Sequence, residues 1–276
     1  MPAGAGHGTR LLRGRRYGAR IAAVPPQGQT FVTVYGRRPV LEALDDERVA
    51  VAQVLLARTA KGEGVDGIVA AADRRGVPLR RVAPEKVTRV SGNGRHDQGV
   101  VADVVAPGMV ELTGWVPPAG PLNLLVLDRV SNPANVGMII RTAVAAGLTG
   151  VVLPRAGVPD VGPLVVKASA GVAYRATLLR SATTLEAVDV LDRAGVVAVG
   201  LESAGAPSLY AGKLPPRAAF VLGNESDGTS AAVAERLAAR RSIPLANGVE
   251  SLNVAAAAAV VAFEVARRQI ERDAER

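Results

Sequence analysis

The chain has 276 residues, of which 49% are hydrophobic and 21% charged, a composition typical of a globular protein of about two domains. It contains no cysteine and only two histidines, which excludes disulfides, thiolate nucleophiles and cysteine zinc sites, and a multi-histidine metal centre would need both histidines. The net charge is +8, and residues 1–30 carry five arginines and no acid. We interpret this stretch as a basic flexible tail that contacts phosphates, or alternatively as a leader that only adds solubility.

No segment has the length and apolarity of a membrane span. The apolar stretch 254–263 near the C-terminus has 10 residues and is stopped by Glu264. The N-terminal segment has arginines but no apolar run of signal-peptide length. The sequence therefore predicts a cytoplasmic protein.

Residues 31–106 alternate between β-branched apolar runs and amphipathic segments, which predicts a small α/β domain. Strands are expected at 31–35, 49–57, 77–82 and 99–105, and helices at 36–44, 65–75 and 84–90. Residues 107–121 are rich in proline and glycine, so we predict a linker there.

A second alternation over 122–276 predicts a further α/β domain. Strands are expected at 123–128, 150–154, 173–178, 195–201, 218–223 and 242–246. Helices are expected at 135–147, 163–170, 184–194 and 230–240, with a last helix from about residue 251 to the end. The first half of that last helix is apolar nearly all round, which predicts that it is buried.

Three segments of the second domain place polar residues where apolar strands end. The first, 128–141, reads DRVSNPANVGMIIR, with Asn135 expected as a helix N-cap and Arg141 inside the helix. The second, 221–228, reads VLGNESDG and carries Glu225. The third, 243–254, reads IPLANGVESLNV and places two polar residues at the start of the last helix. Each segment alone is equally compatible with ordinary turns and helix caps.

Taken together in this order, the three segments resemble the signature motifs of the SpoU/TrmH family of RNA ribose 2′-O-methyltransferases. The resemblance covers essentially 31–276, and SLNVA at 251–255 is its most specific part. YGRRPVLEAL at 35–44 and QGVVA at 98–102 are similar to the small substrate-binding domain of members that act on 23S ribosomal RNA. One departure is Asp97, between His96 and Gln98, where relatives often have no residue.

The resemblance implies an α/β fold in which a small RNA-binding domain, 31–106, precedes a trefoil-knotted SPOUT methyltransferase domain, 122–276. It implies S-adenosylmethionine as cofactor, no metal, RNA as partner and a homodimer joined through the catalytic domain. Family carry-over gives the catalytic set Asn135, Arg141, Glu225, Ser251 and Asn253. It gives the cofactor-binding set Leu222, Gly223, Ile243, Leu245, Leu252 and Gly200.

The expected function is 2′-O-methylation of a ribose in RNA, with 23S ribosomal RNA favoured and a role in antibiotic self-resistance left open. Alternatives are a tRNA 2′-O-methyltransferase and a non-catalytic RNA-binding or ribosome assembly factor. A generic oxidoreductase is disfavoured because no Gly-x-Gly-x-x-Gly turn follows Asp128. A guanidinium stays protonated, so we expect Arg141 to bind a phosphate and stabilise the developing alkoxide, not to act as a base.

Overall fold

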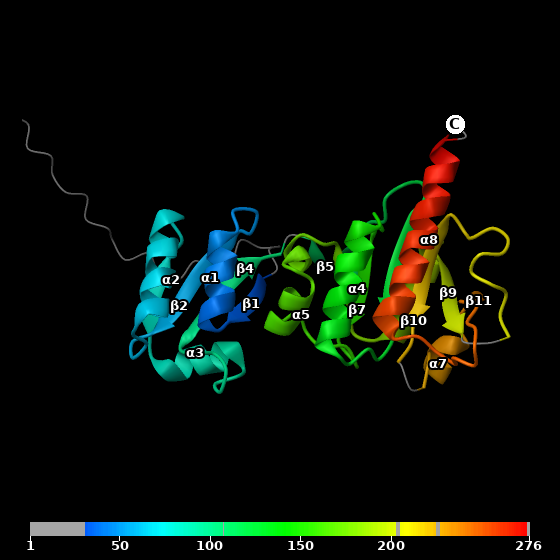
Figure 1. Ribbon diagram of the computed structural model, residues 1–276. Helices are drawn as coiled ribbons and strands as arrows, with labels where there is room; N and C mark the ends of the chain where they lie inside the picture. The colour runs from blue at the N-terminus through cyan, green and yellow to red at the C-terminus, as the bar shows by residue number, and fades with distance from the viewer. Residues whose placement is uncertain (1–30, 107, 203–204, 225–226, 275–276) are drawn as a thin grey trace, which may run out of the picture.

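The computed structural model describes residues 31–106, 108–202, 205–224 and 227–274, so the predicted basic tail and Glu225 lie outside the described residues. Two sheets lie in succession along the chain (Figure 1). Within the described residues, no helix has the length and apolarity needed to cross a bilayer.

The N-terminal sheet has the order β1-β4-β2-β3 and is antiparallel except for the β2–β3 pair. Its strands are β1 (Phe31–Tyr35), β2 (Val51–Ala57), β3 (Leu79–Val82) and β4 (Val100–Val105). Its helices are α1 (Arg37–Asp45), α2 (Glu63–Arg74) and α3 (Pro84–Ser91). The predicted alternation is therefore confirmed, with boundaries shifted by a few residues.

The second sheet is parallel throughout, in the order β11-β9-β10-β6-β7-β8-β5. Its strands are β5 (Met109–Glu111), β6 (Leu122–Leu127), β7 (Gly150–Pro154), β8 (Leu178–Ser181), β9 (Val197–Glu202), β10 (Arg217–Leu222) and β11 (Ala239–Ser242). β6 and β10 are the central pair and are apolar on both faces, as expected of strands covered by helices on either side.

Helices cover both faces of this sheet. α4 (Pro133–Ala145) and α8 (Val254–Ala274) lie side by side on one face (Figure 1), where they pack with α5 (Pro163–Ala168). α6 (Thr184–Arg193) covers the other face, next to the short α7 (Ala231–Ala234). Alternate residues of β6 accordingly divide between two cores: Leu125 and Leu127 pack with α4 and α8, whereas Leu124 and Val126 pack with α6.

The stretch expected to be a linker also belongs to the second sheet. β5 pairs with β8 from Met109 to Glu111 and so forms the edge of the sheet, and Leu112, in the short 3-10 turn Leu112–Gly114, is buried. The second unit of the fold therefore begins before residue 122, at the strand that closes the edge of its sheet.

Three predicted elements in the second domain are wrong. Residues 172–174 form a 3-10 turn and β8 starts only at Leu178, where it pairs with Val151. The helix expected at 230–240 stops after α7, because residues from Ala239 pair with β9 and become β11. Pairing with a neighbouring strand overrides the helical preference of this alanine-rich stretch. The strand expected at 242–246 is also wrong, because β11 ends at Ser242, two residues before Pro244, which has no N–H to donate to a neighbouring strand.

Candidate active site

A cavity of about 490 Å³ opens at the carboxyl ends of β9 and β10. Open parallel sheets bind their ligands at this edge, where several loops meet. Six of the predicted site residues line it: Leu222, Gly223, Ile243, Leu245, Ser251 and Leu252. Leu201 and Glu202 line it where Gly200 was expected to contribute. Gly200 itself faces the side chain of Leu237, three residues beyond the end of α7, since a Cβ there would lie 2.4 Å from Cδ1 of Leu237.

Gly223 is required by the loop that follows β10. A Cβ at this position would lie 2.2 Å from the carbonyl carbon of Gly228 and 2.3 Å from the amide nitrogen of Thr229. Asn224 and Gly228 exchange both main-chain hydrogen bonds, at 3.0 and 2.9 Å, so this loop folds tightly back on itself. The backbone of the loop itself therefore leaves no room for a side chain at position 223.

Arg129, which the sequence analysis did not select, ties the loop after β6 to the loop after β10. Its Nη2 donates to the carbonyl of Gly228 at 3.1 Å, and its own carbonyl accepts from Nδ2 of Asn224 at 3.1 Å. The residue has a φ of 59°, a left-handed conformation that is uncommon outside glycine. The buried carboxylate of Asp128 accepts from the amide of Ser230 at 2.7 Å. In the sequence, the polar pair Asp128-Arg129 directly after an apolar strand was the feature that could have indicated Arg129.

Asn253 joins the first and third motifs. Its Oδ1 accepts from the amides of Ala255 at 2.9 Å and Ala256 at 3.4 Å, which caps α8. Its Nδ2 donates to Oδ1 of Asn135 at 3.3 Å. Two predicted catalytic residues thus meet at the base of α4 and α8.

Asn135 is not the N-cap of α4, contrary to the prediction. The cap is Asn132, whose side chain accepts from the amide of Ala134 at 2.9 Å, because Pro133 takes the first helical position. Asn135 therefore lies in the first turn of the helix, where it is buried.

Arg141 lies apart from the cavity. It is exposed on α4, is absent from the cavity lining, and has no hydrogen bond or ion pair with any residue in the described ranges. Met138 and Val144 are exposed on the same helix, and Phe263 and Ile270 are exposed on the neighbouring α8. Ala145, Phe263 and Ile270 line a shallow groove between the two helices.

Carboxylates give the cavity an acidic rim. Glu202, Asp227 and Glu250 line it, and Glu202 is paired with Arg240 at 2.6 Å and Asp227 with Arg129 at 3.5 Å. Glu250 has no ion-pair partner among the described residues, so the rim keeps a negative charge that favours a cationic ligand. In the described part of the chain, no group of three or more histidine or acidic side chains is arranged to hold a metal ion.

The N-terminal unit presents a separate open groove of about 540 Å³ lined by Arg37, Thr59, Ala60, Gln98 and Gly99. The amide of Arg37 donates to Oε1 of Gln98 at 2.9 Å, and Gln98 has a φ of 51°. The side chain of Asp97 holds this loop through hydrogen bonds.

The buried Asp97 carboxylate accepts from Oγ1 of Thr88 at 3.2 Å, Oγ of Ser91 at 3.1 Å and the amide of Gly99 at 2.9 Å. Asp97 is therefore a structural support of the groove.

Residues 123–263 match the SpoU rRNA methylase family, and residues 33–109 match the family described as RNA 2'-O ribose methyltransferase substrate binding. The chain belongs to the SpoU rRNA methylase family. This confirms the predicted family, its SPOUT fold class and the assignment of the chain as a methyltransferase.

Named relatives carry more specific descriptions. The chain is 34% identical, over 86% of its length and 96% of the relative's, to the 23S rRNA (guanosine-2'-O-)-methyltransferase RlmB of Xylella fastidiosa. An AdoMet-bound rRNA methyltransferase from Sinorhizobium meliloti is 26% identical, with a TM-score of 0.61 over 87% of each chain. The SpoU methyltransferase AviRb from Streptomyces viridochromogenes, in complex with AdoMet, is 25% identical, with a TM-score of 0.62 over 88% of this chain and 92% of that one.

Proposed function

We propose that this SpoU family member transfers a methyl group from S-adenosylmethionine to a ribose 2′-hydroxyl of RNA, and that its substrate is 23S ribosomal RNA. The observation that carries the proposal is the cavity built from the second and third motif loops, which gathers six of the predicted site residues. The 34% identity to RlmB over nearly the whole relative supports 23S rRNA as the substrate. We place the activity in the cytoplasm, where bacterial ribosomal RNA is assembled.

The cavity fits this cofactor in size, shape and charge. Its volume of about 490 Å³ falls within the usual range for small-molecule sites. Leu222, Ile243, Leu245 and Leu252 offer an apolar surface for a flat base. The acidic rim suits a sulfonium. When bound, this cofactor supplies a methyl group on a positively charged sulfur, ready for in-line displacement.

Arg141 is proposed to act on the RNA. Its guanidinium has no partner in the described chain, and its planar fork matches a phosphate group. Held beside the phosphate next to the target ribose, the cation would stabilise the alkoxide that develops as the hydroxyl attacks. Asn135 and Asn253 are proposed to fix the distance between α4, which carries Arg141, and the third motif loop.

We also propose a homodimer joined through α4 and α8. Phe263 and Ile270 are 54% and 70% exposed, and they stand beside Met138 and Val144 as an apolar surface that a second copy would cover. In such a dimer Arg141 faces the partner chain, because it lies on this surface and not in its own cavity. Each active site would then combine the cavity of one chain with Arg141 of the other.

The groove of the N-terminal unit is proposed to select the RNA. Arg37 lines it, and the exposed Arg58 and Lys61 flank it, so phosphates would meet three cations there. A truncated chain that begins at Gly108, and so keeps β5, should bind S-adenosylmethionine but methylate 23S rRNA poorly. Methylation at the rate of the full chain would contradict this division of labour.

The substrate assignment is tested by incubating the protein with radiolabelled S-adenosylmethionine and purified 23S rRNA, 16S rRNA or tRNA. We expect label in one ribose of 23S rRNA, located by mapping 2′-O-methylation in strains with and without the gene. Label in tRNA alone would favour the tRNA alternative, and RNA binding without label would favour an assembly factor. Antibiotics that bind the large subunit, applied to the same strains, show whether the methyl group protects the ribosome.

A further inference from the structure

The loop from residue 205 to residue 216, between β9 and β10, extends the edge of the second sheet. The amide of Leu209 donates to the carbonyl of Ser242 at 2.7 Å, and the amide of Ser242 donates to the carbonyl of Pro207 at 2.9 Å. The loop thus runs beside the last residue of β11, and it lies next to the C-terminal helix α8 in space (Figure 1).

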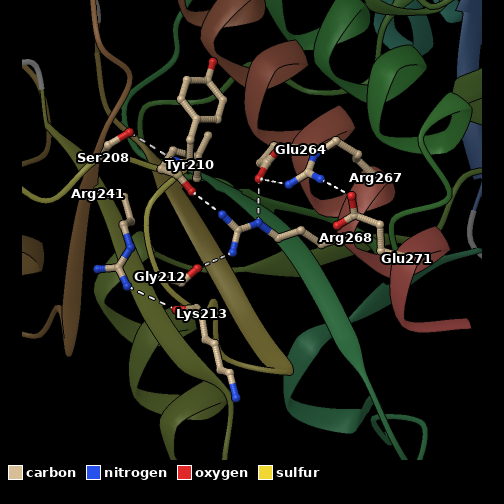
Figure 2. Close-up of polar contacts among 10 residues, drawn as sticks. Ser208, Tyr210, Gly212, Lys213, Arg241, Glu264, Arg267, Arg268 and Glu271 are labelled. Carbon is tan, nitrogen blue, oxygen red and sulfur yellow. Dashed lines mark hydrogen bonds and ion pairs between the residues drawn. The ribbon is translucent and has the colours of Figure 1, made fainter. Parts of the chain in front are cut away.

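Arg268 of α8 fixes this loop from the other side. Nη1 of Arg268 donates to the carbonyl of Gly212 at 2.6 Å, and Nη2 donates to the carbonyl of Leu209 at 2.9 Å. Its Nε donates to the carboxylate of Glu264, one turn earlier (Figure 2). The two side chains are only 13% and 6% exposed. A guanidinium neutralised by a buried carboxylate is therefore used to hold two main-chain carbonyls of one loop.

The two strands next to the 205–216 loop, β9 and β11, both lead to residues that line the cavity. Leu201 and Glu202 precede the loop, and both line the cavity. Ile243 also lines it, and it directly follows Ser242, to which the loop is bonded. Arg241 of β11 also contacts the loop through a longer hydrogen bond, in which its Nη2 donates to the carbonyl of Lys213 at 3.3 Å (Figure 2). Displacement of the loop would move two walls of the cavity at once.

We propose that Arg268, supported by Glu264, is a positioning residue that keeps the cofactor cavity in its binding shape by holding the 205–216 loop. The identity of the ligand rests on the proposed function, whereas the effect on the loop does not. A buried ion pair contributes little to stability compared with apolar side chains of similar size. The match between the guanidinium fork and two carbonyls of this loop points to a specific geometric role.

The variants Arg268→Leu, Arg268→Lys and Arg272→Leu test the proposal in the full-length protein. Arg272 is a matched control, one turn further along α8, whose Nη2 donates to Gln269 of the same helix and not to the loop. Hydrogen exchange of residues 205–216 is measured without ligand, and S-adenosylmethionine affinity by calorimetry. Methyl transfer to 23S rRNA then gives KM for the cofactor and kcat separately.

We expect Arg268→Leu to speed exchange in the loop and to raise Kd and KM for S-adenosylmethionine about tenfold, the effect of losing charge-assisted hydrogen bonds, with kcat little changed. Arg268→Lys should recover part of the affinity, and Arg272→Leu should behave as wild type. Unchanged exchange or unchanged affinity in Arg268→Leu would overturn the proposal, as would an equal loss in Arg272→Leu.

If the wild-type protein bound no S-adenosylmethionine, the proposed function would fail, while the exchange result would still decide the role of Arg268 in holding the loop. Should Arg268→Leu not fold, the same comparison of exchange and affinity is made with Arg268→Lys.

Discussion

The cavity and the exposed α4–α8 surface differ in almost every physical property. The cavity is concave, built from loops at strand ends, and shaped by main-chain contacts such as those around Gly223 and Arg129. The α4–α8 surface is helical and apolar, and it carries one unpartnered cation, Arg141, among the described residues.

This difference separates two tasks within one chain. The cavity is complete in a single copy and suits a small cationic ligand. The helical surface offers a cation but no enclosure, and in the proposed dimer a second copy would supply it. The hydrogen bond from the exposed Asn253 to the buried Asn135 connects the two regions. Because the two tasks are separate, a substitution in one region should change either cofactor affinity or methyl transfer at saturating cofactor, and not both.

The largest effect is expected for Arg141→Ala. Methyl transfer should fall about 10²–10³-fold, the usual cost of losing one group that stabilises a developing oxyanion. Arg141→Lys should also be poor, because a point charge does not reproduce the two-pronged fork. Calorimetry should give both variants the wild-type Kd for S-adenosylmethionine. Loss of cofactor binding would show that Arg141 belongs to the cavity.

Phe263→Glu should prevent dimer formation by placing a charge in the proposed interface. Sedimentation should show a monomer, and methyl transfer should fall about 10²-fold because each site loses the arginine of its partner. Val116→Glu is the control, since Val116 is an exposed apolar residue outside α4 and α8. A fully active monomer would place Arg141 in the site of its own chain.

Gly223→Ala and Gly200→Ala make a matched pair in the cavity region. The first places a methyl group against the backbone of Gly228 and Thr229, so the loop must shift and Kd for S-adenosylmethionine should rise more than tenfold. The second meets only the flexible end of Leu237, so Kd should stay within about twofold of wild type. Equal Kd values in calorimetry would remove Gly223 from the binding site.

Asn253→Ala and Asn132→Ala each remove a helix cap, from α8 and α4 respectively. Each should lower the free energy of unfolding by about 1 kcal/mol in urea titrations. Only Asn253→Ala also loses the contact with Asn135, so only this variant should lower kcat at saturating cofactor. An equal loss of kcat in both variants would assign the effect to helix capping.

The smallest expected effect is on the stability of the fold at acidic pH. The hydrogen bond from Arg267, and then that from Arg268, holds the pKa of Glu264 below its ordinary value of 4.5. A carboxyl with a depressed pKa stabilises the fold above about pH 4.5, and this stability is lost as the pH falls through the folded-state value. Glu264→Gln should flatten the pH dependence of the melting temperature in that window. An unchanged slope would mean that the ion pair does not contribute.

The alternation of strands and helices could be predicted because apolar periodicity reflects burial, as in β6 and α4. The segment from residue 239 to 242 could not, because its place in β11 depends on pairing with β9, which is distant in the sequence. The same holds for the site. Loop glycines and apolar strand ends such as Gly223 and Ile243 carry a local signal, whereas the contacts of Arg129 and Arg268 involve partners that only the fold brings near.

The most direct test of the separation between the two regions mixes the variants Arg141→Ala and Gly223→Ala and measures methyl transfer to 23S rRNA at an S-adenosylmethionine concentration far below the Kd of the Gly223→Ala chain, where each variant alone is nearly inactive. In a mixed dimer, the intact cavity of the Arg141→Ala chain faces the intact Arg141 of the Gly223→Ala chain. Random exchange of subunits should therefore restore about a quarter of the wild-type activity, because half of the dimers are mixed and each has one complete site. If exchange is demonstrated and activity stays at the level of the separate variants, Arg141 and the cavity act within the same chain, and the account is contradicted.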